Sequence, residues 1–397
     1  MSGCGPGQTT CYDLAVIGGG IQGAGVAQAA AAAGYSVLLA ERHSWGAGTS
    51  SKSSKLIHGG LRYLRYGQLR LVRESLRERH ILERIAPHLV WPDQFHVPVY
   101  RSTGVRPWQL RLALGLYWML SGCRADARFQ RLSPEHWPES TGLNRAGLQQ
   151  IFAYRDARTD DRRLTAAVVA SAASLGAELA CPAHVTGASW RDGCWQIGLE
   201  DTAGTRRTAA RLLVNCAGPW ADQVAATIDP RPPQPRITLV QGAHLVLSRP
   251  AVDRCYYLEA PEDGRAVFLL PWGEGSLLGT TETPFSGSPD DARITPGEEA
   301  YLLRILGHYF PGEVPEIAAR MAGLRVLPAS PAAPFRRSRE VMLAHTPRRR
   351  PNYIGVYGGK LTGYRATALR VLRLARDSLP RRRARADTAW LALPGID

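Results

Sequence analysis

Three glycines near the N-terminus have the spacing of a phosphate-binding turn. Gly18, Gly20 and Gly23 follow a short apolar run, Leu14 to Ile17, and precede an alanine-rich stretch with strong helix propensity. This order predicts a strand, a tight turn and a helix. Glycines at these positions let the backbone approach a pyrophosphate, which the free N–H groups at the start of the helix can bind. The pattern therefore predicts a dinucleotide-binding site.

An acidic residue completes this unit. Residues 35–40 read as a second buried strand that ends in Glu41, which gives β-α-β order over about thirty residues. We expect Glu41 to accept hydrogen bonds from an adenosine ribose. Its carboxylate would repel a 2′-phosphate, which disfavours NADP. The spacing by itself leaves FAD and NAD open.

A longer motif, TSSKSSKLIHGGLRYL, follows at residues 49–64. Shorter motifs come later in the chain: LVNCAGPW at 213–220, GAHLV at 242–246, LGTTE at 278–282, GLR at 323–325, RE at 339–340 and GGKLTGYR at 358–365. In this order they resemble the FAD-dependent glycerol-3-phosphate dehydrogenases, a family that passes electrons to quinone or, in its oxidase members, to oxygen. The resemblance covers roughly residues 12–395 and implies FAD as the cofactor.

The family fold implies an α/β protein, with a Rossmann-like FAD-binding domain assembled from discontinuous segments and a mixed-sheet α+β substrate domain. We expect the FAD-binding domain to comprise 12–95, 150–230 and 341–397, and the substrate domain 96–149 and 231–340. Relatives continue with a helical C-terminal domain, so the sequence is expected to be a short form. The basic run after Pro380 is expected to be a solvated tail.

The resemblance also implies the residues around the flavin. From the first motif these are Thr49, Ser50, Ser54, Lys55 and His58, and from the later motifs Gly218, Gly359, Lys360, Leu361 and Thr362. The segment from Gly358 to Thr362 would close over the flavin ring. Small residues and backbone N–H groups there stabilise the negative charge of the reduced flavin, and Lys360 would add to this effect.

Oxidation of glycerol 3-phosphate would need a base beside the C2 hydroxyl while hydride leaves C2 for flavin N5. Histidine suits this task near pH 7, and His244 is the candidate catalytic residue. A lone histidine in an otherwise apolar strand is more often a buried structural residue, and this alternative stays open. His58 is expected to shape the flavin pocket rather than to move protons.

Arginines are expected to hold the phosphate, because a planar guanidinium binds phosphate oxygens in pairs. Matching to the family selects Arg325 and Arg339, with Arg62 and Tyr63 lining the same cavity. These four residues and Lys360 join His244 as the candidate catalytic residues that the resemblance implies. The chain departs from the usual family pattern at Glu282, Val326 and Gly363, where the family has Asp, Pro and Thr. The exact substrate therefore stays open on the sequence alone.

The composition is that of a globular protein with an excess of positive charge. Of 397 residues, 45% are hydrophobic, and 49 Lys and Arg against 34 Asp and Glu give a net charge of +15. Such a charge favours anionic partners. We expect a small phosphorylated substrate or an anionic membrane surface, and no nucleic acid, because no nucleic-acid-binding module is recognisable. The seven cysteines form no CxxC pair, so we expect no metal, no disulfide framework and a reducing, cytoplasmic location.

One segment suggests contact with lipid. No stretch approaches the 18 apolar residues of a membrane span, but the segment Trp108 to Arg124 is flanked by arginines and carries Tyr117 and Trp118. Together with the need to reach a quinone, this predicts peripheral association with the inner face of the cell membrane. A buried helix with basic flanks is the alternative interpretation.

Two other functions compete with the dehydrogenase. One is a related FAD-dependent oxidoreductase acting on a hydroxy acid or an amine. The other is a catalytically inactive flavin-binding module. Retention of His244, Arg325 and Arg339 argues against an inactive module, because such a protein has no physical need for a phosphate-binding cluster.

Overall fold

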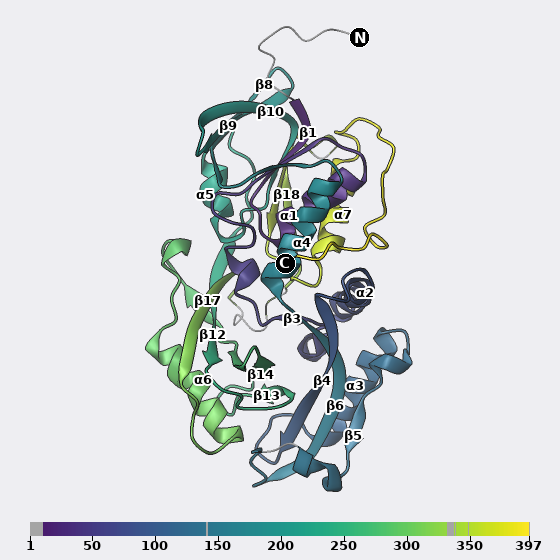
Figure 1. Ribbon diagram of the computed structural model, residues 1–397, viewed down its shortest axis with the longest axis vertical. Helices are drawn as coiled ribbons and strands as arrows, with labels where there is room; N and C mark the ends of the chain where they lie inside the picture. The colour runs from purple at the N-terminus through teal and green to yellow at the C-terminus, as the bar shows by residue number, and fades with distance from the viewer. Residues whose placement is uncertain (1–10, 140–141, 332–336, 338, 348, 397) are drawn as a thin grey trace.

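The computed structural model describes residues 11–139, 142–331, 337, 339–347 and 349–396. Two mixed sheets dominate it, one in the upper and one in the lower part of Figure 1. The first has the strand order β11-β8-β9-β10-β1-β2-β7, and β19 pairs with both β10 and β18. Its strands are β1 (Cys11–Ile17), β2 (Val37–Ala40), β7 (Glu178–Ala180), β8 (Ala183–Arg191), β9 (Cys194–Asp201), β10 (Gly204–Asn215), β11 (Ile228–Asp229), β18 (Met342–His345) and β19 (Tyr353–Tyr357).

The centre of the first sheet is parallel. β1 pairs in parallel with β2 and β10, and β10 pairs in parallel with β19. The helices α1 (Ile21–Ala32), α4 (Asp161–Ser174) and α7 (Tyr364–Ala375) pack beside it, and the alanines of α1 are buried among them. Small side chains explain this packing, because helices with alanine faces can approach each other closely. The predicted β-α-β unit is therefore present as β1, α1 and β2.

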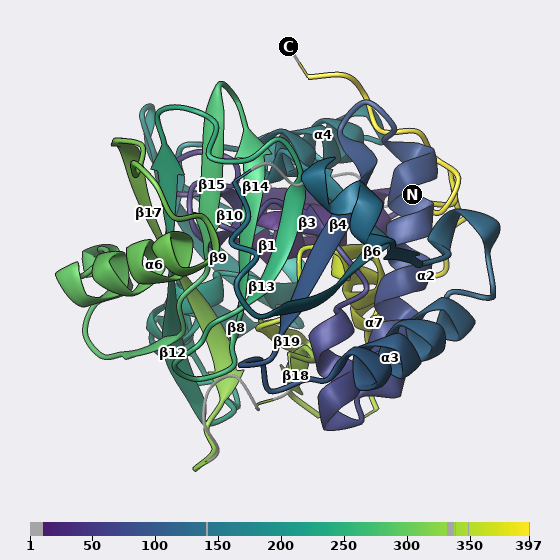
Figure 2. The same ribbon diagram turned by 90° about the horizontal axis from the view of Figure 1, so that it is seen from below.

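The second sheet has the order β16-β12-β15-β14-β13-β4-β6-β3, with β17 paired to β12 and β5 paired to β6. Its strands are β3 (Leu56–Ile57), β4 (Val90–Tyr100), β5 (Gln130–Leu132), β6 (Leu148–Thr159), β12 (Ile237–Leu247), β13 (Cys255–Glu259), β14 (Ala266–Trp272), β15 (Gly275–Gly279), β16 (Thr283–Phe285) and β17 (Ile317–Pro328). The remaining α-helices are α2 (Leu69–Ile85), α3 (Pro107–Leu120), α5 (Ala221–Ala226) and α6 (Pro296–Tyr309). Figure 2 shows α6 on one flank of this sheet and α2 and α3 on the other.

β6 overlaps the range 150–230, which the sequence assigns to the FAD-binding domain, and it pairs along its length with β4 in the second sheet. Hydrophobic alternation identifies a strand but does not say which sheet it joins. The basic run after Pro380 is solvent-exposed over residues 381–385, but the segment is not a free tail, because the Arg385 amide donates to the Ala32 carbonyl at 2.7 Å and the Leu393 amide to the Ile85 carbonyl at 2.7 Å.

Helix α3 exposes part of its apolar surface. Leu110, Leu114 and Tyr117 are buried against the second sheet, whereas Trp108 and Leu112 point outward, 64% and 66% exposed. No helix in the described ranges has the length and apolar character needed to cross a membrane.

Candidate active site

A cavity of about 610 Å³ lies at the carboxyl ends of the parallel strands. Gly18 follows β1, Glu41 follows β2, Gly218 lies beyond the end of β10, and Gly358 follows β19, and all four line the cavity. Parallel strands end at one edge of their sheet, so residues distant in sequence meet there. β17 and residues Arg62 and Tyr63 enclose the cavity from the side of the second sheet.

The glycine motif has the shape of a pyrophosphate site. Gly18 has a φ of +104°, and a Cβ on it would lie 2.7 Å from the Cys216 carbonyl oxygen. A Cβ on Gly23 would lie 1.8 Å from the Gly18 oxygen, so Gly23 brings the helix and strand together behind the cavity. The N-cap residue of α1, Gly20, has no side chain of its own to cap the helix. The helix therefore presents its N-terminus toward the cavity, where an anion would be favoured.

The adenosine end contains Glu41. Its carboxylate accepts hydrogen bonds from the Gly19 amide at 2.7 Å and from the His43 amide at 2.9 Å. A carboxylate has about four acceptor positions, so Glu41 keeps capacity for ribose hydroxyls. Arg42 packs over the Trp220 ring, 4.6 Å from its centroid, beside this end of the cavity.

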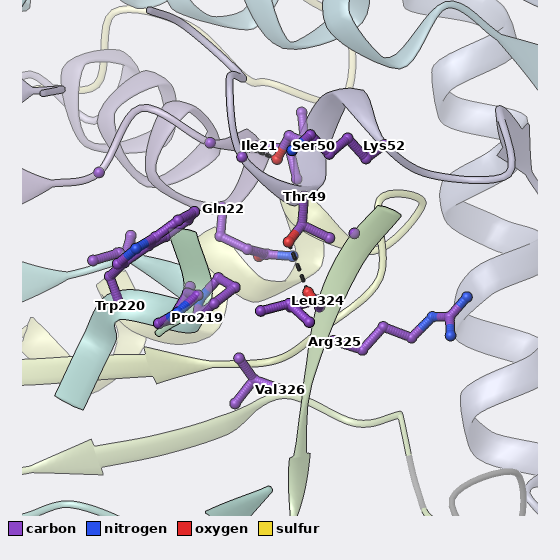
Figure 3. A pocket seen from close by; sticks show the side chains of 18 of the residues that line it. Ile21, Gln22, Thr49, Ser50, Lys52, Pro219, Trp220, Leu324, Arg325 and Val326 are labelled. Carbon is purple, nitrogen blue, oxygen red and sulfur yellow. Dashed lines mark hydrogen bonds between the residues drawn. The ribbon is translucent and has the colours of Figure 1, made fainter. Parts of the chain in front are cut away.

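The first motif and β17 approach each other across the cavity. In Figure 3 the Ser50 hydroxyl accepts from the Ile21 amide at 2.9 Å, and the Thr49 hydroxyl donates to the Leu324 carbonyl at 2.7 Å. Trp220 lies on one side in that view and the Arg325 guanidinium on the other. The cavity thus joins the nucleotide site to residues of the second sheet.

The segment after β19 forms the other end. Gly359 has a φ of +90°, and a Cβ on it would lie 2.8 Å from Gln22 Nε2. The same Gln22 amide donates to the Lys360 carbonyl at 3.2 Å, and the His58 amide donates to the Thr362 hydroxyl at 3.1 Å. This turn contacts both earlier motifs. Nothing in the sequence pattern singled out Gln22, although it lies inside the glycine motif.

The structure places most predicted site residues at this cavity. Gly20, Ser54, Lys360 and Leu361 line it, as do the other predicted residues apart from Gly23, Lys55 and His244. Lys55 was expected beside the cofactor, but its ammonium is buried 2.5 Å from Asp161 Oδ1. Asp161 also accepts from the Ser53 amide at 3.0 Å. Lys55 therefore anchors the serine-rich loop to α4, because a buried ammonium must be paired.

His244 lies behind Ser54. It is 1% exposed, and its Nε2 is 2.9 Å from the Ser54 hydroxyl. Burial, helped by Arg325 and Lys55, lowers the pKa of His244 to about 3. The imidazole is therefore neutral near pH 7, and its contact with the cavity passes through Ser54.

Three arginines gather with one carboxylate at the end of the cavity where Lys360 lies. Arg62 Nη1 is 3.2 Å from Glu282 Oε1, and Arg339 donates to the same oxygen. Arg325 is held separately, since Nη1 donates to the Thr281 carbonyl at 3.0 Å. Arg339 is 6% exposed, and its Nε and Nη1 atoms have no hydrogen-bond partner among the residues that the structure describes. Buried guanidinium donors without a partner favour binding of an anion.

Glycine makes room for this cluster. A Cβ on Gly242 would lie 2.4 Å from Arg325 Nη2, so the glycine two residues before His244 lets the Arg325 side chain lie flat across β12. Burial, with Arg339 nearby, lowers the pKa of Arg325 to about 10, and it remains charged near pH 7. Three guanidiniums face a single carboxylate, which gives the site the net positive charge that a phosphate dianion requires.

Comparison with known proteins agrees with this geometry. Residues 13–387 match the family model for FAD dependent oxidoreductase. The chain is 36% identical over 381 residues to the D-erythritol 1-phosphate dehydrogenase of Brucella abortus (strain 2308), covering 94% of this chain and 74% of that protein. It is 36% identical over 371 residues to the aerobic glycerol-3-phosphate dehydrogenase of Escherichia coli (strain K12), covering 90% and 72%.

A solved structure has the same fold with its cofactor. The glycerol-3-phosphate dehydrogenase from Bacillus halodurans complexed with FAD has a TM-score of 0.75 and 27% identity, covering 97% of this chain and 68% of that one. The cofactor of the present protein is FAD, and the close backbone approaches at the glycine turns of Gly18 and Gly359 are compatible with a cofactor lying along the cavity. This chain belongs to the family of FAD-dependent oxidoreductases and is a relative of the bacterial glycerol-3-phosphate dehydrogenases.

Proposed function

We propose that the protein oxidises sn-glycerol 3-phosphate to dihydroxyacetone phosphate and passes the electrons to a quinone. The observation that carries this proposal is the cluster of Arg62, Arg325 and Arg339, with unpartnered donors on the buried Arg339. The cluster lines the cavity at the end where Lys360 and Thr362 lie. A phosphate held there would place the rest of a three-carbon substrate beside the flavin.

Different residues would bind the phosphate and supply positive charge near the flavin ring. Arg325 and Arg339 bind the phosphate, and Arg62, which shares the Glu282 Oε1 atom with Arg339, adds further positive charge. FAD, when bound, accepts the two electrons of the alcohol as a hydride. Lys360, whose Nζ donates to the Ser75 hydroxyl at 2.6 Å, supplies positive charge near the ring. Because these groups are fixed before the substrate arrives, little reorganisation is needed during the reaction.

D-Erythritol 1-phosphate is a second candidate substrate. It offers the same phosphate and a secondary hydroxyl on a chain that is one carbon longer. Glu282 favours it, because its Oε2 atom is buried with no hydrogen-bond partner in the described part of the chain and can accept from an additional hydroxyl. The relative from Brucella abortus named for this substrate is 36% identical.

The two wider alternatives have less support. A positively charged pocket would repel the ammonium group of an amine substrate, although a hydroxy acid could place its carboxylate on the arginines. An inactive flavin-binding module would gain nothing from the unpartnered donors of Arg339, because buried donors without partners cost about 1 to 3 kcal/mol.

Anaerobic reduction of the bound flavin tests these functions together. The protein would be mixed with glycerol 3-phosphate, D-erythritol 1-phosphate, glycerol, lactate or glycine, and the loss of the oxidised flavin spectrum would be followed. Rapid bleaching by glycerol 3-phosphate, and slow or no bleaching by glycerol, lactate and glycine, is the expected result. Faster bleaching by D-erythritol 1-phosphate would assign the second substrate, and bleaching by lactate or glycine alone would reject both phosphates.

For the electron acceptor, we propose a quinone reached at an anionic membrane surface, on the inner face of the cell membrane. The support is the net charge of +15 and the exposed apolar residues of α3. A soluble quinone should reoxidise the reduced flavin faster than oxygen does. Reoxidation that is fastest with oxygen, accompanied by hydrogen peroxide, would assign the oxidase chemistry instead.

A further inference from the structure

We propose that Tyr63 takes the proton of the substrate hydroxyl during the oxidation. This inference deepens the proposed function and rests on it, because only an alcohol substrate has this proton to lose. Tyr63 lines the cavity between the first motif and the arginine cluster, and its side chain is otherwise buried, 4% exposed. The sequence counts Tyr63 among the candidate catalytic residues but assigns it no step of the reaction.

The local backbone fixes the tyrosine ring. Gly60 has a φ of +83° and begins the 3-10 turn η2 (Leu61–Tyr66), in which the Tyr63 amide donates to the Gly60 carbonyl at 2.9 Å. A Cβ on Gly60 would lie 2.3 Å from the Tyr63 ring. The glycine thus lets the ring lie against the backbone, which limits the positions that the hydroxyl can reach.

Positive groups contact Tyr63 on two sides. Arg62 Nη2 donates to the Tyr63 hydroxyl at 3.2 Å, and Lys360 Nζ lies 4.5 Å from the centroid of the ring. Arg339 adds positive charge from the segment before β18. A hydrogen bond from a guanidinium and a nearby ammonium both favour a phenolate over a neutral phenol.

These contacts determine the pKa of the Tyr63 hydroxyl. Burial alone would raise the pKa of Tyr63, but Arg62, Lys360 and Arg339 outweigh it and lower the pKa to about 7. Burial also lowers the pKa of Lys360 to about 8, with Tyr63 opposing that change. A general base is most effective when its pKa lies near the working pH. Tyr63 meets this condition and faces the cavity.

Three other titratable groups near Tyr63 have pKa values far from neutral pH. His58 lines the cavity, but burial, Lys360 and Arg62 lower its pKa well below the usual range. Glu282 is bound to two arginines and stays ionised. Burial raises the pKa of Tyr257, which lies near Arg62, to about 12.

His244 is the competing base, and its position weakens that role. Its Nε2 reaches the cavity only through the Ser54 hydroxyl, and a protonated imidazole would be buried near Arg325 and Lys55. Accepting a proton there would add a third positive charge to a buried group of two. Tyr63 instead loses a negative charge when it accepts the proton, which a buried site tolerates better.

The step balances as follows. The hydride leaves the secondary carbon for FAD, and the hydroxyl proton goes to the Tyr63 oxygen, so the carbon–oxygen bond becomes a carbonyl. The substrate loses two electrons, which FAD gains, and the phenolate becomes a phenol. The phenol returns its proton to solvent before the next substrate is oxidised.

The first experiment measures ionisation in the FAD-loaded protein without substrate. Tyrosine labelled with ¹³C at the ring Cζ reports phenolate formation by NMR. One resonance should titrate near neutral pH in the wild type, disappear in Tyr63→Phe, and persist in Tyr257→Phe. In Lys360→Met its midpoint should move to higher pH, because a cation that stabilises the phenolate is removed. If no tyrosine titrates below about pH 9, the assignment is wrong.

The second experiment measures the reaction. In anaerobic single turnovers of glycerol 3-phosphate, the rate of flavin reduction by Tyr63→Phe should fall about 100-fold or more and lose its rise through neutral pH. FAD content and melting temperature should match the wild type. A variant that keeps both the rate and the pH dependence would return the role to His244. If Tyr63 titrates as expected but no phosphorylated polyol bleaches the flavin, the proposed function falls and the proton role falls with it.

Discussion

Arg62 Nη1 lies 3.2 Å from Glu282 Oε1. Because Arg339 donates to the same oxygen, one carboxylate holds two of the arginines proposed to bind phosphate. Burial would raise the pKa of Glu282, but Arg339, Arg62 and Arg325 outweigh it and lower the pKa to about 2. Glu282 is thus the counter-charge that allows three guanidiniums to share a buried site before an anion binds.

Replacing this carboxylate should destabilise the protein and strengthen anion binding. Glu282→Gln leaves Arg339 and Arg62 without their ionised partner, and breaking a buried pair costs about 3 to 5 kcal/mol. The exposed fraction of Arg62 reduces this effect, so about 2 kcal/mol is expected. Urea unfolding with and without inorganic phosphate measures it. Phosphate should restore more stability to Glu282→Gln than to the wild type, and Glu282→Asp, which keeps the charge, should behave like the wild type.

The same substitution predicts a pH dependence. Glu282 binds fewer protons in the folded than in the unfolded state between about pH 4.5 and its folded pKa of about 2. Its contribution to stability is therefore complete above about pH 4.5 and is lost as the pH falls toward 2. Below pH 4.5 the stability difference between wild type and Glu282→Gln should shrink. A constant difference over this range would show that Glu282 is not ionised in the folded protein.

Substitution of the arginines should distinguish a role in binding the substrate from a purely structural role. Each charge-assisted contact to phosphate contributes about 1.5 to 3 kcal/mol, so Arg339→Met should lower kcat/KM for the phosphorylated substrate about 10- to 100-fold. Turnover of glycerol should hardly change, because it has no phosphate to bind. Arg325→Met should show the same loss together with a lower melting temperature, since Arg325 also donates to Thr280 and Thr281. Equal losses for both substrates in both variants would identify the arginines as structural.

The nucleotide site could be predicted because it is made of one continuous segment. The turn at Gly18 and the acidic residue at Glu41 belong to a single β-α-β unit, whose geometry depends on neighbouring residues. The contact between Gln22 and Lys360 joins residues 338 positions apart. No local pattern encodes such a contact, which depends on how α1 and the segment after β19 meet.

The sequence also could not predict which side chains of a motif face the cavity. Lys55 and Ser54 are adjacent in one motif, yet Ser54 faces the cavity and Lys55 is buried against Asp161. Lys55 has a φ of +58°, which turns its side chain away from the path that the sequence suggests. The motif indicates that a residue is near the site, but packing decides whether it touches the ligand.

Two glycines should respond differently to substitution. A Cβ on Gly20 meets only the Ser50 hydroxyl, at 3.1 Å, so Gly20→Val should fold but lose FAD, because the branched side chain occupies space beside the pyrophosphate. Gly23→Ala should fail to fold, because its Cβ would lie 1.8 Å from the Gly18 oxygen. The ratio of flavin to protein absorbance and thermal unfolding distinguish these outcomes. Full FAD content in Gly20→Val would contradict this placement of the pyrophosphate.

The last prediction concerns the lipid surface. Trp108 and Leu112 lie one helical turn apart on α3 and are both largely exposed, with the exposed Arg111 between them. Each apolar side chain inserted into a membrane interface contributes about 1.5 to 3 kcal/mol, and each basic residue near anionic lipid about 1 kcal/mol. Vesicles with anionic lipid should therefore bind the protein at low salt and release it at high salt, as measured by flotation.

A double variant tests whether α3 is the binding surface. Trp108→Ser with Leu112→Ser should weaken vesicle binding more than about tenfold while leaving flavin reduction unchanged, since neither residue lines the cavity. Trp390→Ser is the matched control, because Trp390 is 69% exposed but stacks on Arg84 far along the chain from α3. Equal binding by all three proteins would mean that α3 is not the docking surface, and no binding by the wild type at low salt would reject membrane association itself.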